Sequence, residues 1–375
     1  MTLQIRVDNL TINRGDKDGF LSMRCYRDLE SLCGQFFFSA TFAKKAFNDY
    51  PIKRGYKVEI LADGHTWMTG YVEEIEVNYD DKKLDVSIAG RDITADVVDA
   101  SCGPRLSFTG PITLKSLIEQ TLKVSGDIPV KVINKVESIE AFSQNELIAA
   151  DIGRDLISFI GEYARKREVL LVTDGAGNLV IERPSSTPLN VKIQNVIGKV
   201  NNILTARMRI SDTERFSQYN VVSQGNGSLL DFSGESLKSQ VFRTGSANDN
   251  AVRSSRQRWI QAENASSNSE CKLRADWEAN NSRARSLTYE CEIDGHSIQD
   301  GTPVNVNQLY PIVDDFAGIT ATMLVRRVDL ISDPNQGNVA KLVFTTPDAY
   351  TPQPVLSPKQ KKSNEIALVW NDEAF

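Results

Sequence analysis

The chain has 375 residues, 41% of them hydrophobic, with 43 lysines and arginines against 49 aspartates and glutamates. This length is enough for roughly two to four packed domains, and the net charge of −6 argues against a surface built to neutralise the phosphates of nucleic acids. No apolar run is long enough to span a bilayer, and the alternating residues 1–8 do not resemble a signal peptide.

Residues 1–100 are expected to form a small antiparallel β-barrel. Apolar and charged side chains alternate over residues 56–60 and again over residues 75–79, so each strand should bury one face. Asp63-Gly64 supplies a turn between the strands. Gly70 interrupts the longer strand, which predicts a bulge or a corner.

Residues 101–186 change to a helical period and are expected to form an α/β insert. One apolar stripe runs from Ile112 to Leu122 and another from Ile152 to Tyr163, which predicts two core-facing helices. The turn at residues 174–177, Asp-Gly-Ala-Gly, lies between two apolar runs and predicts a hairpin. The segment 184–188 has a proline at each end and closes the insert.

A second, discontinuous barrel is expected from residues 187–235 together with residues 301–350. This region and the first barrel are candidates for two copies of one architecture with different insertions. Residues 236–300 form an excursion that is expected to contain a helix over 268–284 and a strand over 287–293. The predicted fold class is therefore α+β, mostly antiparallel β, with two small β-barrel domains and α/β insertions.

Residues 351–375 are expected to form a C-terminal linker followed by a docking arm. Prolines and a lysine-rich run indicate a solvated linker. The apolar segment that follows is too short to fold alone, so it either docks against another subunit or protein or is a frayed chain end. The candidate docking residues are Ile366, Leu368, Val369 and Trp370.

Little in the sequence indicates chemistry. The five cysteines are odd in number and include no Cys-x-x-Cys pair, so we expect reduced, buried thiols. The histidines, His65 and His296, have no potential ligands at a recognisable spacing, so we expect role-free loop histidines, with no metal, cofactor or catalytic residue. The paired acids at 80–81 and 314–315 point apart in a strand or turn, which favours solvated turns over acid and base catalysis.

The segment from Gly90 to Asp99 is the candidate structural corner. A strand that ends in Gly-Arg runs directly into a helix whose first turns carry acids. Arg91 is expected to pair with Asp96 and Asp99 and to hold the barrel to the insert, either as a buried ion pair or as a solvated set of charges. The candidate residues are Gly90, Arg91, Asp92, Thr94, Asp96 and Asp99.

This segment resembles the Mu-like phage baseplate hub (tail protein) family, whose barrel strand ends in Gly-Arg and runs into a Thr-x-Asp-hydrophobic-hydrophobic-Asp helix. Several weaker matches occur in the family's order. They are Gly70-Tyr71-Val72, the segment Asn248–Arg253, the helix with Cys271, Arg274, Ala275 and Trp277, and the segment Thr346–Tyr350. The resemblance covers nearly the whole chain and depends on the order and spacing of these matches.

The resemblance implies a fold related to other contractile-tail hubs and to the N-terminal part of type VI secretion spike proteins. It implies a structural, non-enzymatic baseplate hub of a contractile phage tail. Such a hub would be a homotrimer with pseudo-sixfold symmetry that joins the hexameric tail tube to the trimeric central spike. Its partners would be the central spike protein, the tail tube or adjacent baseplate proteins, and the tape-measure protein. DNA would pass through without specific binding. The hub would lie in the virion, at the tail baseplate, after assembly in the host cytoplasm.

Two expectations about the assembly follow. Trimer interfaces should run along the barrel edges, because an unpaired edge invites uncontrolled association. The channel lining should be neutral to acidic, because DNA must slide through it rather than bind.

Two other classes of function stay open. A tail-associated glycan or peptidoglycan hydrolase would need two carboxylates that converge across a cleft, and the sequence shows no such pair. A carbohydrate-binding module of a host-recognition fibre would favour exposed aromatic side chains, whereas the four tryptophans are dispersed along the chain.

Overall fold

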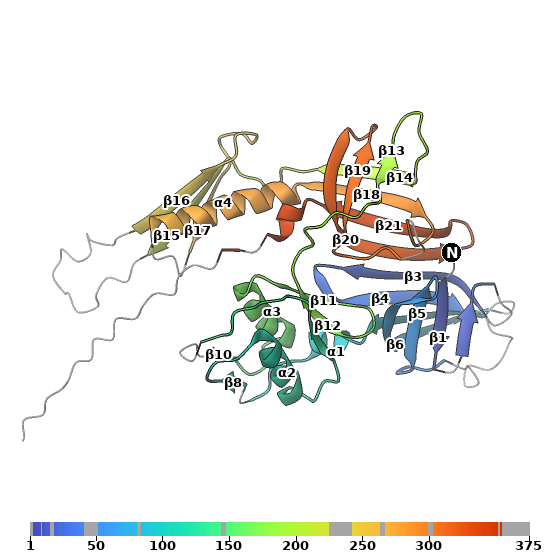
Figure 1. The fold of residues 1–375 in the computed structure, drawn as a ribbon. Helices are drawn as coiled ribbons and strands as arrows, with labels where there is room; N and C mark the ends of the chain where they lie inside the picture. The colour runs from blue at the N-terminus through green and yellow to red at the C-terminus, as the bar shows by residue number, and fades with distance from the viewer. Residues whose placement is uncertain are drawn as a thin grey trace, which may run out of the picture. The chain divides into compact units, whose positions relative to one another are not determined.

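Antiparallel strands dominate the fold and helices are few, in agreement with the predicted α+β class (Figure 1). The computed structural model describes residues 3–8, 10–15, 19–40, 52–80, 84–104, 106–143, 148–224, 242–262, 267–298, 303–351 and 353–354. The chain divides into two compact units. The larger contains residues 1–213 and 281–352, and the smaller contains residues 214–280 and 353–375.

The larger unit is built on one 13-stranded sheet, in which the longest path of paired strands is β14-β18-β21-β20-β3-β4-β7-β6-β5-β1-β2. β19 pairs with β20, and β13 pairs with β19. The strands of the first half are β1 (Leu3–Val7), β2 (Leu10–Asn13), β3 (Phe20–Asp28), β4 (Ser31–Ala40), β5 (Lys57–Ala62), β6 (His65–Tyr79) and β7 (Leu84–Asp92). The strands of the second half are β13 (Ile193–Asn195), β14 (Ile203–Ile210), β18 (Leu287–Asp294), β19 (Leu309–Asp314), β20 (Ile319–Asp333) and β21 (Gly337–Thr345).

The same arrangement of strands occurs twice in this sheet. The order β3-β4-β7-β6-β5-β1 of the first half corresponds to β14-β18-β21-β20-β19-β13 of the second. β-Bulges also occur at corresponding places. Glu73 is left unpaired in the β6–β7 ladder, and Arg326 is left unpaired in the corresponding β20–β21 ladder. In the same way Leu21 is left unpaired in the β3–β4 ladder, and Leu204 in the β14–β18 ladder. Bulges are specific local features, so the two halves are two copies of one strand architecture, except that β1 pairs antiparallel with β5 whereas β13 pairs parallel with β19.

Among the strands that the structure describes, a single pairing joins the two copies. Residues 327–332 of β20 pair antiparallel with residues 23–28 of β3, and one hydrophobic core runs through both copies. In the part of the chain that the structure describes, the strand pairings do not close into a ring. The expectation of two barrels is therefore unconfirmed, and it stays a prediction together with the domain boundaries.

The predicted helices and the hairpin of the insert are confirmed. They are α2 (Leu114–Val124), α3 (Leu156–Lys166) and the β11–β12 hairpin, which pack with α1 (Ala95–Asp99) around a second hydrophobic core that Leu32 of β4 also joins. β11 (Leu170–Thr173) pairs with β12 (Leu179–Glu182), which also pairs with β9 (Val132–Asn134), while β8 (Ser107–Phe108) pairs with β10 (Ile148–Ala149). The predicted apolar stripe was wrong at Ile152, which is 75% exposed and precedes the helix, because the chain turns at Gly153 with a φ of 80°.

The smaller unit is a three-stranded sheet covered by a helix. Its strands are β15 (Gln218–Gln224), β16 (Phe242–Asn248) and β17 (Gln257–Gln261), and α4 (Asn268–Arg285) begins in this unit. Gly245 allows the helix to approach the sheet closely, since a Cβ there would lie 2.1 Å from the backbone nitrogen of Lys272. The predicted helix and the strand that follows it are thus confirmed as α4 and β18, and β18 belongs to the large sheet.

Gly70 marks a close backbone approach, and the bulges of β6 lie three residues to either side of it, at Trp67 in the ladder with β5 and at Glu73 in the ladder with β7. A Cβ at Gly70 would lie 1.9 Å from the carbonyl oxygen of Arg91 on the paired strand.

Backbone in a ladder cannot move aside, so we expect Gly70→Ala to lower the free energy of unfolding by about 2 kcal/mol, measured by urea denaturation. Gly103→Ala is the control, because nothing lies within 4 Å of a Cβ there. Equal stability of the two variants would contradict the close approach.

Candidate functional site

The candidate corner begins at a glycine that the packing requires. A Cβ at Gly90 would lie 2.1 Å from the carbonyl oxygen of Tyr71 and 2.3 Å from the ring of Phe36. Any larger residue would push β7 away from β6 and β4. Gly90 therefore fixes the point at which the strand leaves the sheet and enters the insert.

Arg91 forms a half-exposed ion-pair cluster with two acids. Its guanidinium donates to Glu73 at 2.7 Å and to Asp99 at 2.5 Å. The side chains of Arg91, Glu73 and Asp99 are 26%, 42% and 57% exposed, so the cluster is closer to the solvated alternative than to a buried pair. Hydrogen bonds from Arg91 lower the pKa of Asp99, and the two carboxylates raise the pKa of Arg91.

The sequence predicted only one of these two pairs. Asp96 does not join the ion pair, and burial raises the pKa of its carboxyl group. Glu73 was missed as a partner because it is the bulged residue of β6, and the bulge turns its side chain toward β7. The cluster therefore connects β6, β7 and the end of α1.

Asp92 and Thr94 are buried under this surface cluster, at 1% and 0% exposure. The Asp92 carboxylate accepts hydrogen bonds from the backbone N–H of Gly34 and of Thr94, both at 2.9 Å, and it also contacts the Thr94 hydroxyl. Burial raises the pKa of Asp92, while the hydrogen bonds from Gly34, Thr94 and Thr173 oppose that change. Both residues therefore have a structural role inside the protein.

A buried arginine that the sequence did not indicate completes this region. Arg27 is 3% exposed and donates to the carbonyl oxygens of Thr173 at 2.5 Å and Trp67 at 3.5 Å, with its guanidinium 5.3 Å from the Trp67 ring centre. Burial lowers the pKa of Arg27, and the charge of Asp92 is the largest opposing influence. Trp67 in turn donates from its indole nitrogen to the carbonyl of Val304 at 3.2 Å. These contacts join the first copy, the insert and the second copy. We call this group of residues the buried node; it consists of Arg27, Trp67, Asp92, Thr94 and Thr173.

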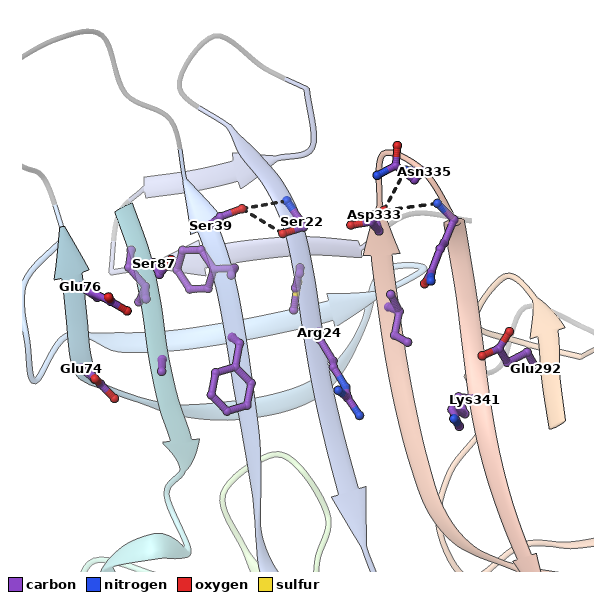
Figure 2. Close-up of a pocket in the computed structure, with 17 residues that line it drawn as sticks. Ser22, Arg24, Ser39, Glu74, Glu76, Ser87, Glu292, Asp333, Asn335 and Lys341 are labelled. Atoms are coloured by element: carbon purple, nitrogen blue, oxygen red, sulfur yellow. Dashed lines mark hydrogen bonds between the residues drawn. The ribbon is translucent and has the colours of Figure 1, made fainter. Parts of the chain in front are cut away.

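A groove of about 880 Å³ lies across the face of the sheet opposite its core and spans both copies (Figure 2). Glu74 and Glu76 lie on one side of it, and Glu292 and Lys341 lie on the other. The charged residues of its lining are the acids Glu74, Glu76, Glu292 and Asp333 and the bases Arg24 and Lys341. The groove is therefore a mixed, slightly acidic surface.

Several of these charged groups already have structural partners. Arg24 pairs with Asp329 at 2.7 Å, and Glu292 accepts a hydrogen bond from the Thr205 hydroxyl at 2.9 Å. Asp333 accepts from the backbone N–H of Asn335 at 2.8 Å and so shapes the β20–β21 turn. Over the described residues, no group of three or more histidines, cysteines and acids is placed to hold a metal ion.

One prediction about isolated polar residues was wrong, at Asp314. His296 lies in a loop, as expected, and is fully buried there; its Nε2 lies 3.1 Å from the carbonyl oxygen of Ile331, and burial lowers its pKa. Asp314 is 2% exposed and accepts a hydrogen bond from the Tyr289 hydroxyl at 2.6 Å, so it is not part of a solvated turn. All five cysteines are free and buried, as expected.

The candidate docking arm, Ile366, Leu368, Val369 and Trp370, lies outside the residues that the structure describes. Its role stays a prediction. Within the described residues, the longest helices are too short or too polar to cross a membrane.

We expect Asp92→Asn to lower the free energy of unfolding by about 2–3 kcal/mol, because the amide nitrogen would face one of the two backbone N–H donors, of Gly34 or of Thr94, whichever way the side chain is oriented. Urea denaturation measures this loss. Asp99→Asn is the control, since it removes a half-exposed pair and should cost only about 0.2–1 kcal/mol. A larger effect at Asp99 than at Asp92 would show that the surface cluster, rather than the buried node, stabilises the corner.

Comparisons with known proteins point to one group. Residues 9–92 match the model of the N-terminal domain of the GpP-like Mu phage baseplate assembly protein. The chain is 27% identical over 320 residues to the baseplate hub protein gp44 of Escherichia phage Mu, covering 85% of this chain and 82% of that protein.

Solved structures agree with this similarity. The 43 kDa tail protein of prophage MuSo2 from Shewanella oneidensis superposes with a TM-score of 0.78 at 27% identity, over 94% of this chain and 100% of that one. An E. coli type VI secretion component, described as similar in structure to the T4 tail proteins gp27 and gp5, shares the fold at a TM-score of 0.51 and 9% identity, over 94% of this chain and 80% of that one. Together these similarities confirm the predicted resemblance of the chain to the Mu-like phage baseplate hub (tail protein) family.

Proposed function

We propose that the chain is the structural, non-enzymatic baseplate hub of a contractile phage tail. It forms a homotrimeric ring that joins the hexameric tail tube to the trimeric central spike and leaves a channel for the tape-measure protein and DNA. Its place is the tail baseplate of the virion, after assembly in the host cytoplasm. Its protein partners are the spike, the tail tube or adjacent baseplate proteins, and the tape-measure protein.

The observation that carries this proposal is the repeated strand architecture within one continuous sheet. A trimer of such chains contains six similar copies, which can stack on a sixfold tube. The insert follows only the first copy, and the smaller unit interrupts only the second. Because these additions differ, the same ring keeps true threefold symmetry for a trimeric partner.

The groove supports the channel part of the proposal. Four of the six charged residues in its lining are acids. A wall with mixed charges and an acidic excess does not bind phosphates strongly, so DNA can slide past it. Tight, salt-sensitive DNA binding by the groove face would contradict this role.

We expect the purified chain to sediment as a trimer, at three times 41.7 kDa or about 125 kDa, over a range of concentrations. Sedimentation equilibrium measures this mass. A concentration-independent monomer that hydrolyses bacterial cell-wall glycan would contradict the hub and support the alternative, a tail-associated glycan or peptidoglycan hydrolase.

The docking arm is proposed to bind the spike, the tube or a neighbouring subunit through Trp370, its largest apolar side chain. Trp370→Ala should weaken binding of that partner at least tenfold and leave the melting temperature unchanged; co-sedimentation and thermal denaturation measure the two effects. Trp259→Ala is the matched control, because Trp259 is 70% exposed elsewhere on the chain. If removal of residues 359–375 changes neither spike attachment nor tail assembly, the arm has no docking role.

A further inference from the structure

The three-stranded sheet of the smaller unit has α4 packed on one of its faces (Figure 1). Tyr219 and Val221 of β15 are 0% exposed and pack with Cys271 and Ala275 of α4 in a small hydrophobic core. Because side chains alternate along a strand, the residues between and beside these two point to the opposite face. We call that opposite face the open face.

The strand ladders show which side chains share the open face. Asn220 of β15, the central strand, lies opposite Ser246 of β16 and opposite Trp259 of β17. The described members of the open face are Gln218, Asn220, Val222, Thr244, Ser246, Asn248, Gln257, Trp259 and Gln261. They cover roughly 10 Å by 14 Å, at about 4.8 Å between strands and about 3.4 Å per residue.

The open face has no charged side chain among its described members. The charged residues of the three strands, Arg243 and Arg258, both belong to the face that α4 covers. Arg258 lies opposite Tyr219, and its guanidinium group lies 5.3 Å from the centre of the Phe216 ring. The sheet therefore carries its charges on the helix side and presents mainly amides and hydroxyls on the open face.

Trp259 is 70% exposed and lies in the middle row of the open face. Tryptophan is on average a well-buried residue type, so an indole ring that is this exposed is unusual for a side chain without a ligand. The ring offers a flat apolar surface and one N–H donor at its edge. Among its described members, the open face thus combines one aromatic ring with polar groups.

Asn220 is the buried polar group of the open face. It is 9% exposed, and its side-chain amide has no hydrogen bond within the part of the chain that the structure describes. Buried amides normally have a partner, and this one has N–H donors and a carbonyl acceptor to offer. Asn248, Gln257 and Gln261 are exposed and likewise make no side-chain hydrogen bond to described residues. These amides are therefore available to a ligand.

We propose that the open face binds a neutral glycan, with the indole of Trp259 against the C–H face of a pyranose ring and the amide of Asn220 on its hydroxyl groups. Sugar hydroxyls donate and accept hydrogen bonds, as amides do, so the two kinds of group are complementary. A face without charge offers no ion pair to a phosphate or a carboxylate, which argues against nucleic acids, anionic lipids and acidic glycans.

The inference goes beyond the proposed hub role, and only the source of the glycan rests on that role. A component of a phage tail meets a bacterial envelope, so the source to which we commit is an uncharged polysaccharide of a bacterial surface. Binding itself depends on the smaller unit alone.

The size of the open face favours a glycan over a protein partner. Its area is roughly 140 Å², whereas a stable protein interface buries about 800 Å² on each partner. The centres of protein interfaces are also apolar and rich in aromatic residues, but the described apolar members of the open face are Val222 and Trp259. A few sugar rings fit this surface, and a protein would need to extend well beyond it.

Isothermal titration calorimetry of the full chain with neutral oligosaccharides tests the proposal. The probes are hexasaccharides of glucose, galactose and N-acetylglucosamine, together with uncharged oligosaccharides released from bacterial surface polysaccharide. We expect at least one of them to bind, and Trp259→Ala to weaken that binding at least tenfold. Trp259→Tyr should restore most of the affinity, because it keeps a ring that can stack. Phe316→Ala is the matched control, since Phe316 is 75% exposed in the larger unit and should not affect binding.

Two further measurements test the polar part of the site. Asn220→Ala removes the unpaired amide and should weaken binding about three- to tenfold; a melting temperature close to that of the unchanged chain shows that the loss is not unfolding. The affinity should be the same at about 50 mM and about 200 mM salt, because no ion pair forms, whereas binding of a polyanion falls steeply over this range.

The outcomes separate this inference from the hub role. Failure of every neutral probe to bind at millimolar concentration overturns the inference, and so does binding that Trp259→Ala leaves intact. Salt-sensitive binding of acidic glycans alone, or a tail protein that binds the chain through Trp259 in place of any glycan, also overturns it. Glycan binding by a chain that sediments as a monomer supports the open face and overturns only the trimeric hub.

Discussion

The backbone pairing of β20 with β3 is the interaction on which the rest of the larger unit depends (Figure 1). It converts two edges that would otherwise be open into the middle of one sheet. Asp329, 1% exposed, lies at this seam and accepts hydrogen bonds from Arg24 and Arg327. A buried carboxylate is tolerated there because two guanidinium groups compensate for its lost hydration.

Repetition of the strand architecture leaves room for different additions. The insert follows β7 in the first copy, and the smaller unit lies in sequence between β14 and β18 of the second. Both additions leave from strand ends, so neither interrupts the ladders. A sheet of this kind can present similar surfaces in both copies and still carry different attachments, which is what a junction between sixfold and threefold partners requires.

The buried node explains how the insert is held. Arg27 and Asp92 carry opposite charges with little access to water. Arg27 donates a hydrogen bond to the carbonyl oxygen of Thr173, and Asp92 accepts one from the backbone N–H of Gly34, so both are held by other parts of the larger unit. Gly175, at the tip of the β11–β12 hairpin, allows this contact, since a Cβ there would lie 2.1 Å from the carbonyl oxygen of Trp67. By contrast, the Arg91 cluster is half exposed, so salt weakens it and its contribution to stability is small.

Local features of the chain were predictable from the sequence because short-range physics determines them. Asp63 and Gly64 both adopt positive φ, at 49° and 84°, as a two-residue hairpin turn requires, and the apolar stripes of α2 and α3 identify their buried faces. Likewise β7 ends at Asp92 and α1 begins at Ala95, next to the Gly-Arg pair, since the end of a strand and the beginning of a helix are both local signals.

The tertiary structure alone decided which strands lie side by side and which polar groups are buried. A period of two shows that a strand has one apolar face, but it does not specify the neighbouring strand, and β3 and β20 are about 300 residues apart in the chain. For the same reason the sequence missed Arg27 and Glu73, did not reveal the burial of His296, and placed Asp314 in solvent. Their surroundings are formed by segments distant in sequence, so burial and pairing at these positions exist only once the whole sheet has formed.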